Sequence, residues 1–597
     1  MKTFLYRNRY TLILALIIIS QLCYTTYMFC QREGWHIDEA WSYEFANANH
    51  QVGIYFDEKE NVINYGEWLD SSVFKDYIEV QDGGAFHFSD AYYNCTANHN
   101  NPPLYNMILH AVCSFFPNTF SWWFSYFINV ISFIIAMLAL YALSKEINNS
   151  PAVALIACAF YGSTTAALNT FIFLRMYALL TALVILLFYV HSRLYNKNFK
   201  KPALCYISLF ILVVVGGSTQ YIYLFLGFCI TTIFSLFLIA GRKWKVLLGY
   251  CSTMASAAIT VFLLWPYDLE KFTTPSLYGA EMPYIWEVKY CLQCVFNETL
   301  GIRIPFLNPL RKAILLVIFI YALIIISGIC FILRKNSRFK NFIRSLYTST
   351  ILWFKKLPIR LQKMNKLYLL FTFTWITTLL IIAKTCNIFI MSVYADRYLF
   401  CLFPIVSSLF VCILFKCIQY IHMRHFKKNR IFTVVSLALT LVALIIINHI
   451  NYPCNYLFER NCDDPVISDI VKDSNVILVT KAPGNLPYYP PLFLDTKQFF
   501  VTSPFDDIDA TLESMNRLND TSSSVYLIAE TSIFLSEDYQ RNESSEKDTY
   551  DLEGALSCQY KLSEFLDKIA SCKWVTELKY IQTEDSFKGP LAVYKLR

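Results

Sequence analysis

Long, uninterrupted runs of apolar residues occupy most of the chain up to about residue 450. Each run holds close to the ~20 residues that a helix needs to cross the hydrocarbon core of a bilayer. We predict about eleven membrane-spanning helices from these runs. Their expected positions are 11–30, 120–143, 152–168, 171–190, the two arms of a hairpin that turns near 216–218, 246–265, 314–333, 367–385, 398–420 and 431–447.

Residues 450–597 follow a different pattern, in which short apolar segments alternate with polar ones. Buried strands are predicted at 475–480, 498–501, 524–528 and 591–594, and a helix at 564–570. Alternating strands and helices are typical of a small α/β domain with a partly parallel sheet. The predicted fold class is therefore an α-helical polytopic membrane protein, residues 1–449, with a C-terminal extracytoplasmic α/β domain.

Charge sets the predicted orientation. Only 16% of the residues are charged, against about 25% in soluble domains. Residues 334–366 contain ten Lys or Arg and no acid, whereas residues 31–101 contain thirteen acids and three bases. The positive-inside bias places the basic segment and the amino terminus in the cytoplasm of a cell-membrane protein. The acidic loop and the C-terminal domain then lie outside, and the net charge of +7 does not indicate a nucleic-acid partner.

Four cysteines fall in the C-terminal region, which is predicted to lie outside the cytoplasm, where disulfides persist. Cys454–Cys462 and Cys558–Cys572 are plausible pairs by spacing. The sequence does not fix the connectivity.

Asp38 and Glu39 are adjacent carboxylates a few residues after the first predicted span. Such a pair suits a general base and a neighbour that tunes it. The alternative is an ordinary solvated acidic loop, because acidic pairs are common on surfaces. The pair is also compatible with a divalent cation, but no ligand spacing indicates a metal or any other cofactor.

Two arginines lie in otherwise apolar surroundings at the predicted outer membrane boundary. Arg175 stands beside Tyr177 near the start of one span, and Arg397 opens another. A guanidinium in an apolar run is costly and is usually functional. Its fork of donors suits a lipid phosphate, whereas the alternative is an arginine that extends to the headgroups.

Two further polar groups are predicted at the same depth. His99, Asn101 and Tyr105 surround a Pro-Pro pair that opens a helix at 102–116, which we expect to lie at the outer surface. Gln220 and Tyr221 follow the turn of the predicted hairpin. The alternatives are a plain helix start and a plain polar turn. Convergence of all these groups on one boundary favours a site that uses a lipid-linked substrate.

The motifs 38–39, 101–105 with His110, 175–177, 219–221 and 397–399 resemble, in this order, those of polytopic glycosyltransferases of the GT-C superfamily. The similarity is strongest to bacterial glycosyltransferase family 39-like proteins, the group of protein O-mannosyltransferases and lipid A aminoarabinose transferases. It covers roughly residues 1–447. Each motif is weak alone, whereas their order and placement together are specific.

The resemblance implies inverting transfer of a sugar from a polyprenyl-phosphate donor in the membrane to an acceptor hydroxyl outside the cytoplasm. The acceptor would be a glycan, a lipid or a protein. The resemblance makes Asp38 the general base, with Glu39 assisting, and gives the donor phosphate to Arg175 and Arg397. The resemblance also assigns Tyr177 and Tyr221 to donor binding. The residues that it assigns to substrate binding are His99, Asn101, Tyr105 and Gln220.

The chain departs from the family pattern at three places. Related sequences have an acid or a histidine before the proline motif, a glutamate where Phe173 stands, and a histidine where Gln220 stands. Two other functions stay open. One is a lipid-linked sugar transporter or flippase, which should place ionisable groups at mid-membrane in broken helices. The other is a non-catalytic cell-envelope assembly protein built around the C-terminal domain.

Overall fold

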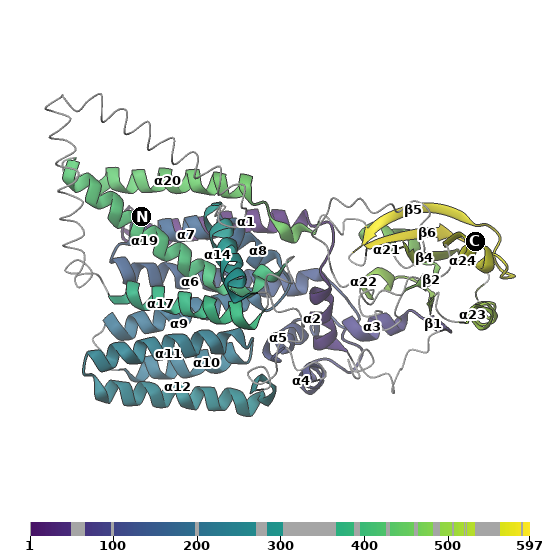
Figure 1. Cartoon of the computed structure of the whole chain (residues 1–597), viewed down its shortest axis with the longest axis horizontal. Helices are drawn as coiled ribbons and strands as arrows, with labels where there is room; N and C mark the ends of the chain where they lie inside the picture. Colours follow the sequence, from purple (N-terminus) through teal and green to yellow (C-terminus); the bar gives the residue numbers. More distant parts are fainter. Residues whose placement is uncertain are drawn as a thin grey trace, which may run out of the picture.

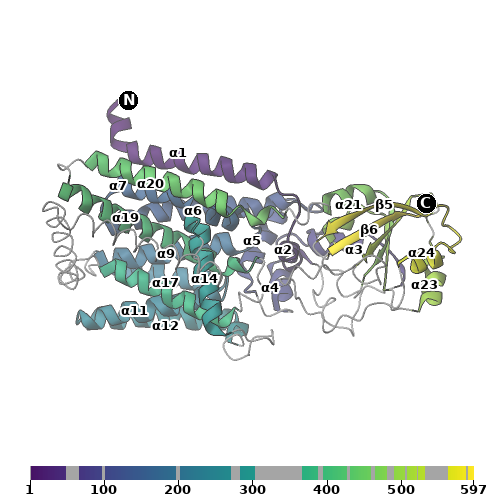
Figure 2. The ribbon, with the colours of Figure 1, turned by 45° about the horizontal axis from the view of Figure 1, so that its top comes forward.

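The computed structural model describes residues 2–48, 66–96, 101–196, 202–269, 283–302, 366–386, 394–425, 430–458, 464–480, 490–503, 507–518, 520, 522–531, 562–586 and 589–597. A helical bundle lies at one end of the long axis and an α/β domain at the other (Figure 1). Figure 2 gives the same arrangement from a second direction, with the start of the chain at the end of the bundle remote from the domain.

Eight helices in the described part of the chain are long and apolar enough to cross a membrane, which confirms the polytopic fold. These spans belong to α1 (Lys2–Cys30), α6 (Trp122–Asn148), α9 (Tyr177–Asn196), α11 (Ile222–Ala240), α12 (Trp244–Leu264), α17 (Lys366–Thr385), α19 (Phe403–His425) and α20 (Arg430–Asn451). The hairpin arm α10 (Ala203–Gly217) is apolar but shorter. The span predicted at 314–333 lies outside the described residues.

Three of the predicted spans differ from the structure in detail. The segment 152–168 is not one straight helix but α7 (Pro151–Tyr161) and α8 (Thr165–Ile172), which meet at 65°. The span predicted to start at 171 begins at Tyr177, because residues 173–176 are not helical. The span predicted to start at 398 opens with the 3-10 helix η3 (Ala395–Leu402). The non-helical segment 173–176 contains Arg175, and η3 contains Arg397.

The acidic segment between the first two spans is folded rather than an open loop. It contains α2 (Ile37–Asn47), β1 (Trp68–Asp70), α3 (Ser72–Ile78), α4 (Phe88–Thr96) and α5 (Leu104–Cys113). A helix is therefore present within the predicted range 102–116. The helices of this acidic segment lie between the bundle and the sheet of the α/β domain (Figure 1). A second segment, between α12 and α17, contains η2 (Pro266–Leu269) and α14 (Tyr284–Leu300), neither of which was predicted.

The α/β domain holds a six-stranded sheet in the order β1-β3-β2-β4-β6-β5. Its own strands are β2 (Asn475–Val479), β3 (Gln498–Thr502), β4 (Val525–Glu530), β5 (Lys579–Ser586) and β6 (Gly589–Lys595). Its helices are α21 (Asp464–Val471), α22 (Pro490–Phe493), α23 (Ile508–Met515) and α24 (Leu562–Ile569), and η4 (Asn455–Leu457) precedes them. Strands β3, β2 and β4 are parallel, which confirms the partly parallel sheet.

The edge strand β1 was not predicted. It comes from the acidic segment and pairs antiparallel with β3. The domain is thereby joined through its sheet to the segment that carries α2. Cys454 and Cys572 are free thiols, and their proposed partners Cys462 and Cys558 lie outside the described residues.

Candidate functional site

Asp38 and Glu39 lie in the first turn of α2, which is closed by a capping box. The backbone N–H of Asp38 donates to Nδ1 of His36 at 3.1 Å, and that of His36 donates to Oε2 of Glu39 at 3.0 Å. This reciprocal pairing fixes where the helix begins. Asp38 is 8% exposed and Glu39 is fully buried, so the pair does not belong to a solvated loop.

Two guanidinium groups surround Asp38. Arg397 Nη2 lies 3.3 Å from Oδ2 of Asp38. Arg175 Nη1 donates to the backbone oxygen of Asp38 at 2.8 Å and to Oγ of Ser42, one turn further along α2, at 2.9 Å. The ring nitrogen Nδ1 of His36 is 3.9 Å from the other carboxylate oxygen. The structure thus brings together the acid and both arginines that the sequence placed at one boundary.

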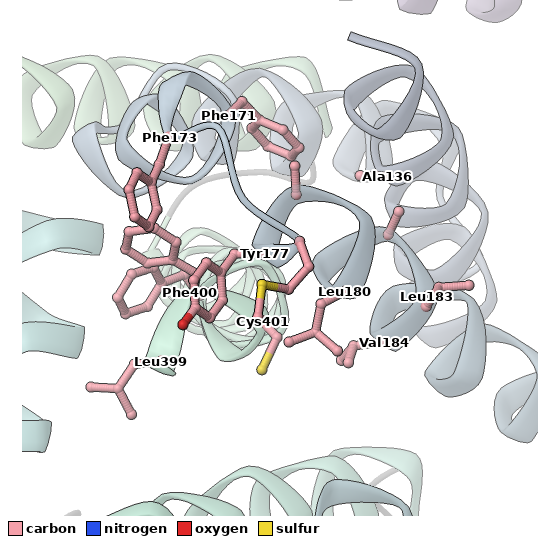
Figure 3. Close-up of a cluster of buried hydrophobic side chains, with 14 of the residues drawn as sticks. Ala136, Phe171, Phe173, Tyr177, Leu180, Leu183, Val184, Leu399, Phe400 and Cys401 are labelled. Carbon is pink, nitrogen blue, oxygen red and sulfur yellow. The ribbon is translucent and has the colours of Figure 1, made fainter. Parts of the chain in front are cut away.

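Arg175 owes its position to the break between α8 and α9. Side chains from other elements satisfy backbone groups that the broken helix leaves unpaired. Asn129 donates to the carbonyl of Phe173 at 2.8 Å, and the N–H of Leu174 donates to Oε1 of Glu39 at 2.7 Å. Figure 3 shows Phe173 on this stretch, with its ring packed into a buried apolar cluster. Arg175 is buried, so it does not extend outward to lipid headgroups.

Glu39 is fully occupied by protein partners. Its Oε2 forms an ion pair with Arg32 and accepts the N–H of His36, while Oε1 accepts the N–H of Leu174. The Arg32 guanidinium also lies over the ring of Phe458, 4.9 Å from its centroid. Neither oxygen of Glu39 is left without a partner for a substrate.

The charge balance around Asp38 is positive. Burial raises the pKa of Asp38, but Arg397 and Arg175 outweigh that effect and hold this pKa well below its usual range. Burial and the neighbouring arginines lower the pKa of His36 to about 4, so His36 is neutral near pH 7. Arg32 and Glu39 form an ion pair, so within the cluster of Arg32, Asp38, Glu39, Arg175 and Arg397 the Asp38 carboxylate faces two cations. The Nε atoms of Arg175 and Arg397 are buried and have no hydrogen-bond partner among the residues that the structure describes.

Both candidate tyrosines lie in the aromatic surroundings of this site. Tyr177, the first residue of α9, stacks on Phe173 and meets Phe400 edge to face, with ring centroids 5.9 Å apart in both cases. Figure 3 shows it beside Phe400 and Cys401. Tyr221 precedes α11, and its hydroxyl lies 3.9 Å from Sγ of Cys386.

Of the four residues predicted to bind substrate, the structure describes Asn101, Tyr105 and Gln220. The Tyr105 hydroxyl is buried against Oγ of Ser125 at 2.6 Å, and Gln220 uses Oε1 to accept its neighbour's backbone N–H at 2.8 Å. Asn101 is half-buried just before α5, and His99 lies outside the described residues. The role of these residues in substrate binding stays a prediction.

Several residues that shape the site were missed from the sequence. Arg32 neutralises Glu39, and the His36 ring is enclosed by Phe173 and Tyr394, with centroids 5.8 and 5.2 Å away. Arg32 is one of only three bases in the acidic segment, and that rarity was an available signal. Among the residues that the structure describes, no cluster of three or more His, Cys, Asp or Glu side chains is arranged to hold a metal ion.

No protein-family model matches the chain, and no curated protein matches it in sequence. Solved structures of similar shape include ArnT from Cupriavidus metallidurans bound to undecaprenyl phosphate, at 9% identity and a TM-score of 0.47, covering 98% of both chains. Another is the oligosaccharyltransferase AglB from Archaeoglobus fulgidus with an inhibitory peptide and dolichol phosphate. It matches at 10% identity and a TM-score of 0.41, over 89% of this chain and 70% of that one. These values are too low to assign a function, which we derive from the site.

Proposed function

We propose that this protein is a membrane glycosyltransferase that moves a sugar from a polyprenyl-phosphate donor to an acceptor hydroxyl, on the side of the membrane where the α/β domain lies. The observation that carries the proposal is the buried Asp38 between Arg397 and Arg175. A carboxylate can accept a proton, and two arginines can hold a phosphate. The transfer needs both at one place.

The two arginines would bind the donor phosphate and stabilise it as it leaves. Arginine matches phosphate oxygens with a planar fork of donors. Positive charge placed in advance beside a leaving group stabilises the transition state most strongly in a site that excludes water. The unpartnered Nε atoms of Arg175 and Arg397 leave donors available for this contact.

Asp38 would act as the general base. As the bond between the sugar carbon and the phosphate oxygen breaks, the acceptor oxygen bonds to the opposite face of that carbon and its proton passes to Asp38. In the free protein, Arg397 and Arg175 hold the pKa of Asp38 low, which makes it a weak base. A phosphate that shares the arginines would raise this pKa, so the base strengthens when the donor is bound.

Glu39 would position rather than react, because its oxygens tie α2 to Arg32 and to the break before α9. The rings of Tyr177 and Tyr221 would line the approach of the lipid. Asp38 and the donor phosphate would contact the same two arginines. The positions of these side chains therefore have to be held fixed, and the contacts of Glu39 do this.

A transporter is the second candidate, because the bent pair α7–α8 and the break before α9 are features of transport proteins. The charged groups argue against it. Arg175 contacts the first turns of α2, so the break lies at the end of the bundle rather than in its middle. Substrate movement into proteoliposomes without sugar transfer would favour the transporter.

The test uses the full chain in detergent, undecaprenyl phosphate as a binding probe, and a panel of undecaprenyl-phosphate-linked sugars as donors. Asp38→Asn should lower transfer by about 10²–10⁴-fold, the usual contribution of a general base. Binding of undecaprenyl phosphate, followed by native mass spectrometry, should persist. Asp90→Asn, an acid of α4 that is half exposed, is the matched control. Full activity in Asp38→Asn would disprove the assignment of the base.

A further inference from the structure

A second pair of acids is buried behind Arg397. Glu298, in the last turn of α14, is fully buried, and Asp396, which directly precedes Arg397 in η3, is 5% exposed. The two carboxyl groups come from segments almost a hundred residues apart, and neither belongs to the Asp38 cluster.

Each acid accepts one hydrogen bond from a neutral donor. Asn169 of α8 donates to Oε2 of Glu298 at 3.0 Å, and the Tyr456 hydroxyl of η4 donates to Oδ1 of Asp396 at 2.6 Å. The remaining oxygens, Oε1 of Glu298 and Oδ2 of Asp396, are buried and accept from no donor in the described part of the chain. The two side chains are within hydrogen-bond reach of each other.

Two ionised carboxylates cannot share a buried site, because their repulsion adds to the cost of removing both charges from water. A proton held between the two unpartnered oxygens removes one charge and supplies the missing donor. We propose that Glu298 and Asp396 share one proton, and that this carboxyl–carboxylate hydrogen bond holds Arg397 in place beside Asp38. The inference rests on the proposed function, in which Arg397 binds the donor phosphate.

Glu298 is presented by a rigid support. Asn448 of α20 donates to the backbone oxygens of Asn297 and Glu298 at 2.9 and 2.8 Å, and accepts the N–H of Thr165 at 2.8 Å. The helix ends at Gly301, whose φ of +66° suits glycine. A Cβ at this position would meet the backbone of Asn448 at 2.4 Å. The end of α14 is therefore fixed against two other helices.

Asp396 transmits that support to Arg397 through one peptide bond. Arg397 Nη1 donates to the carbonyl of Tyr394 at 3.0 Å, and the Tyr456 hydroxyl is also 3.2 Å from that carbonyl. The 3-10 turn is thus held on one side by the shared proton and on the other by the arginine's own hydrogen bond. If the pair separated, the turn would lose the contact that ties it to α14.

The surroundings of the pair leave few other sources of charge. Arg397 is the cation that acts on Asp396. Within the described part of the chain, the other titratable groups that interact with the pair come from α7, α14 and residues 452–456; they are Tyr161, Tyr290, Cys294, Tyr452, Cys454 and Tyr456. None of these tyrosines and cysteines can carry a positive charge, so loss of the shared proton would add a second negative charge behind Arg397, where it competes with the donor phosphate.

The experiment compares Glu298→Gln with Glu298→Ala in the full-length protein. An amide stands in for a protonated carboxyl and donates to Asp396, so Glu298→Gln should transfer within about threefold of wild type at pH 7. Wild-type kcat should fall on the alkaline side of its pH profile, and that fall should weaken or disappear in Glu298→Gln. Glu298→Ala removes the donor and should lower kcat at least about tenfold and weaken binding of undecaprenyl phosphate. Glu287→Gln removes another buried acid of α14 and is the matched control.

Infrared spectroscopy gives a readout that does not depend on activity. Wild type should show the carbonyl stretch of a protonated, buried carboxyl, and Glu298→Gln and Asp396→Asn should each lose it. Absence of the band in wild type would overturn the inference even if transfer is observed. Equal inactivity of Glu298→Gln and Glu298→Ala, together with loss of wild-type activity in chelator, would also overturn it in favour of a bound cation. A band without transfer would instead reject the proposed function.

Discussion

Two groups of buried acids lie on either side of the Asp396–Arg397 peptide, and they are neutralised in different ways. Asp38 faces two guanidinium groups, whereas Glu298 accepts a hydrogen bond from a neutral amide and Asp396 accepts one from a neutral hydroxyl. Both arrangements reduce the cost of a buried negative charge. The first does so with fixed positive charge, which a phosphate can share. In the Glu298–Asp396 pair a shared proton takes the place of a cation, so this pair offers no positive charge to a phosphate.

This difference assigns the two groups to different tasks. Excess positive charge beside Asp38 suits the binding of an anionic leaving group. The proton-sharing pair suits support, because its hydrogen bonds are all internal. Variants that remove charge should therefore affect the Asp38 side most, and variants that remove only a hydrogen bond should have smaller effects.

Among the variants that test this difference, the largest effect is expected for Arg397→Gln. Glutamine retains a donor but no charge, so transfer should fall about a thousandfold, as for other arginines that neutralise a phosphoryl leaving group. Single-turnover transfer with an undecaprenyl-phosphate-linked sugar measures this. Arg193→Gln, at the far end of α9 and partly exposed, is the control. A residual rate above a tenth of wild type would mean that Arg175 alone carries the phosphate.

Arg32→Leu should mainly affect stability. It leaves Glu39 as an unpaired charge in the interior, which costs about 3 kcal/mol or more. Thermal unfolding in detergent measures the loss. The double variant Arg32→Leu with Glu39→Leu removes both charges and should recover much of it. A double variant no more stable than the single one would show that the backbone contacts of Glu39, not its charge, hold α2.

A smaller effect is expected for His36→Asn, and it depends on pH. The folded pKa of His36, about 4, is below its usual value of 6.5, so the unfolded chain takes up the proton first as the pH falls. Wild type should therefore lose about 2 kcal/mol of stability between pH 7 and pH 5. Asparagine keeps a helix-capping side chain and should remove this dependence. The depressed pKa of Asp38 does not interfere, because its contribution is lost only at lower pH.

Tyr456→Phe should have the smallest effect. It removes one donor to Asp396 but leaves the shared proton, so unfolding should be easier by about 1 kcal/mol. Transfer should stay close to wild type across the pH range. A large loss of activity in Tyr456→Phe would place the hydroxyl, rather than the acid pair, at the centre of the support of Arg397.

The bundle and the parallel core of the sheet could be predicted, because the apolar runs that form them are contiguous in sequence. The break at 173–176 could not, since Phe173 and Leu174 are as apolar as the helices on either side. The N–H of Leu174 pairs with Glu39, and that partner is 135 positions away. Tertiary contact, not local pattern, interrupts the helix there.

Some residues of the candidate site could likewise be predicted from the sequence, and others could not. Asp38, Arg175 and Arg397 could be placed together because the predicted spans put them at one boundary. Glu298 could not be placed at the site from the sequence. Its partner Asp396 is on another helix, and the segment around Glu298 shows no membrane-spanning pattern. Tyr105 and Gln220 have the residue types of binding groups, but sequence does not reveal that Ser125 and a neighbouring N–H already occupy them.

The edge strand β1 has a consequence for how the protein is made. Trp68 pairs with Phe500, a residue that leaves the ribosome more than 400 positions later. At about 5–20 residues per second, β1 waits about 20–90 s for its partner. Throughout that time its unpaired backbone is a template for other strands. Synthesis of the last quarter of the chain is therefore the step at which the segment holding Asp38 becomes anchored, and a chain truncated before β3 would leave that segment without its sheet.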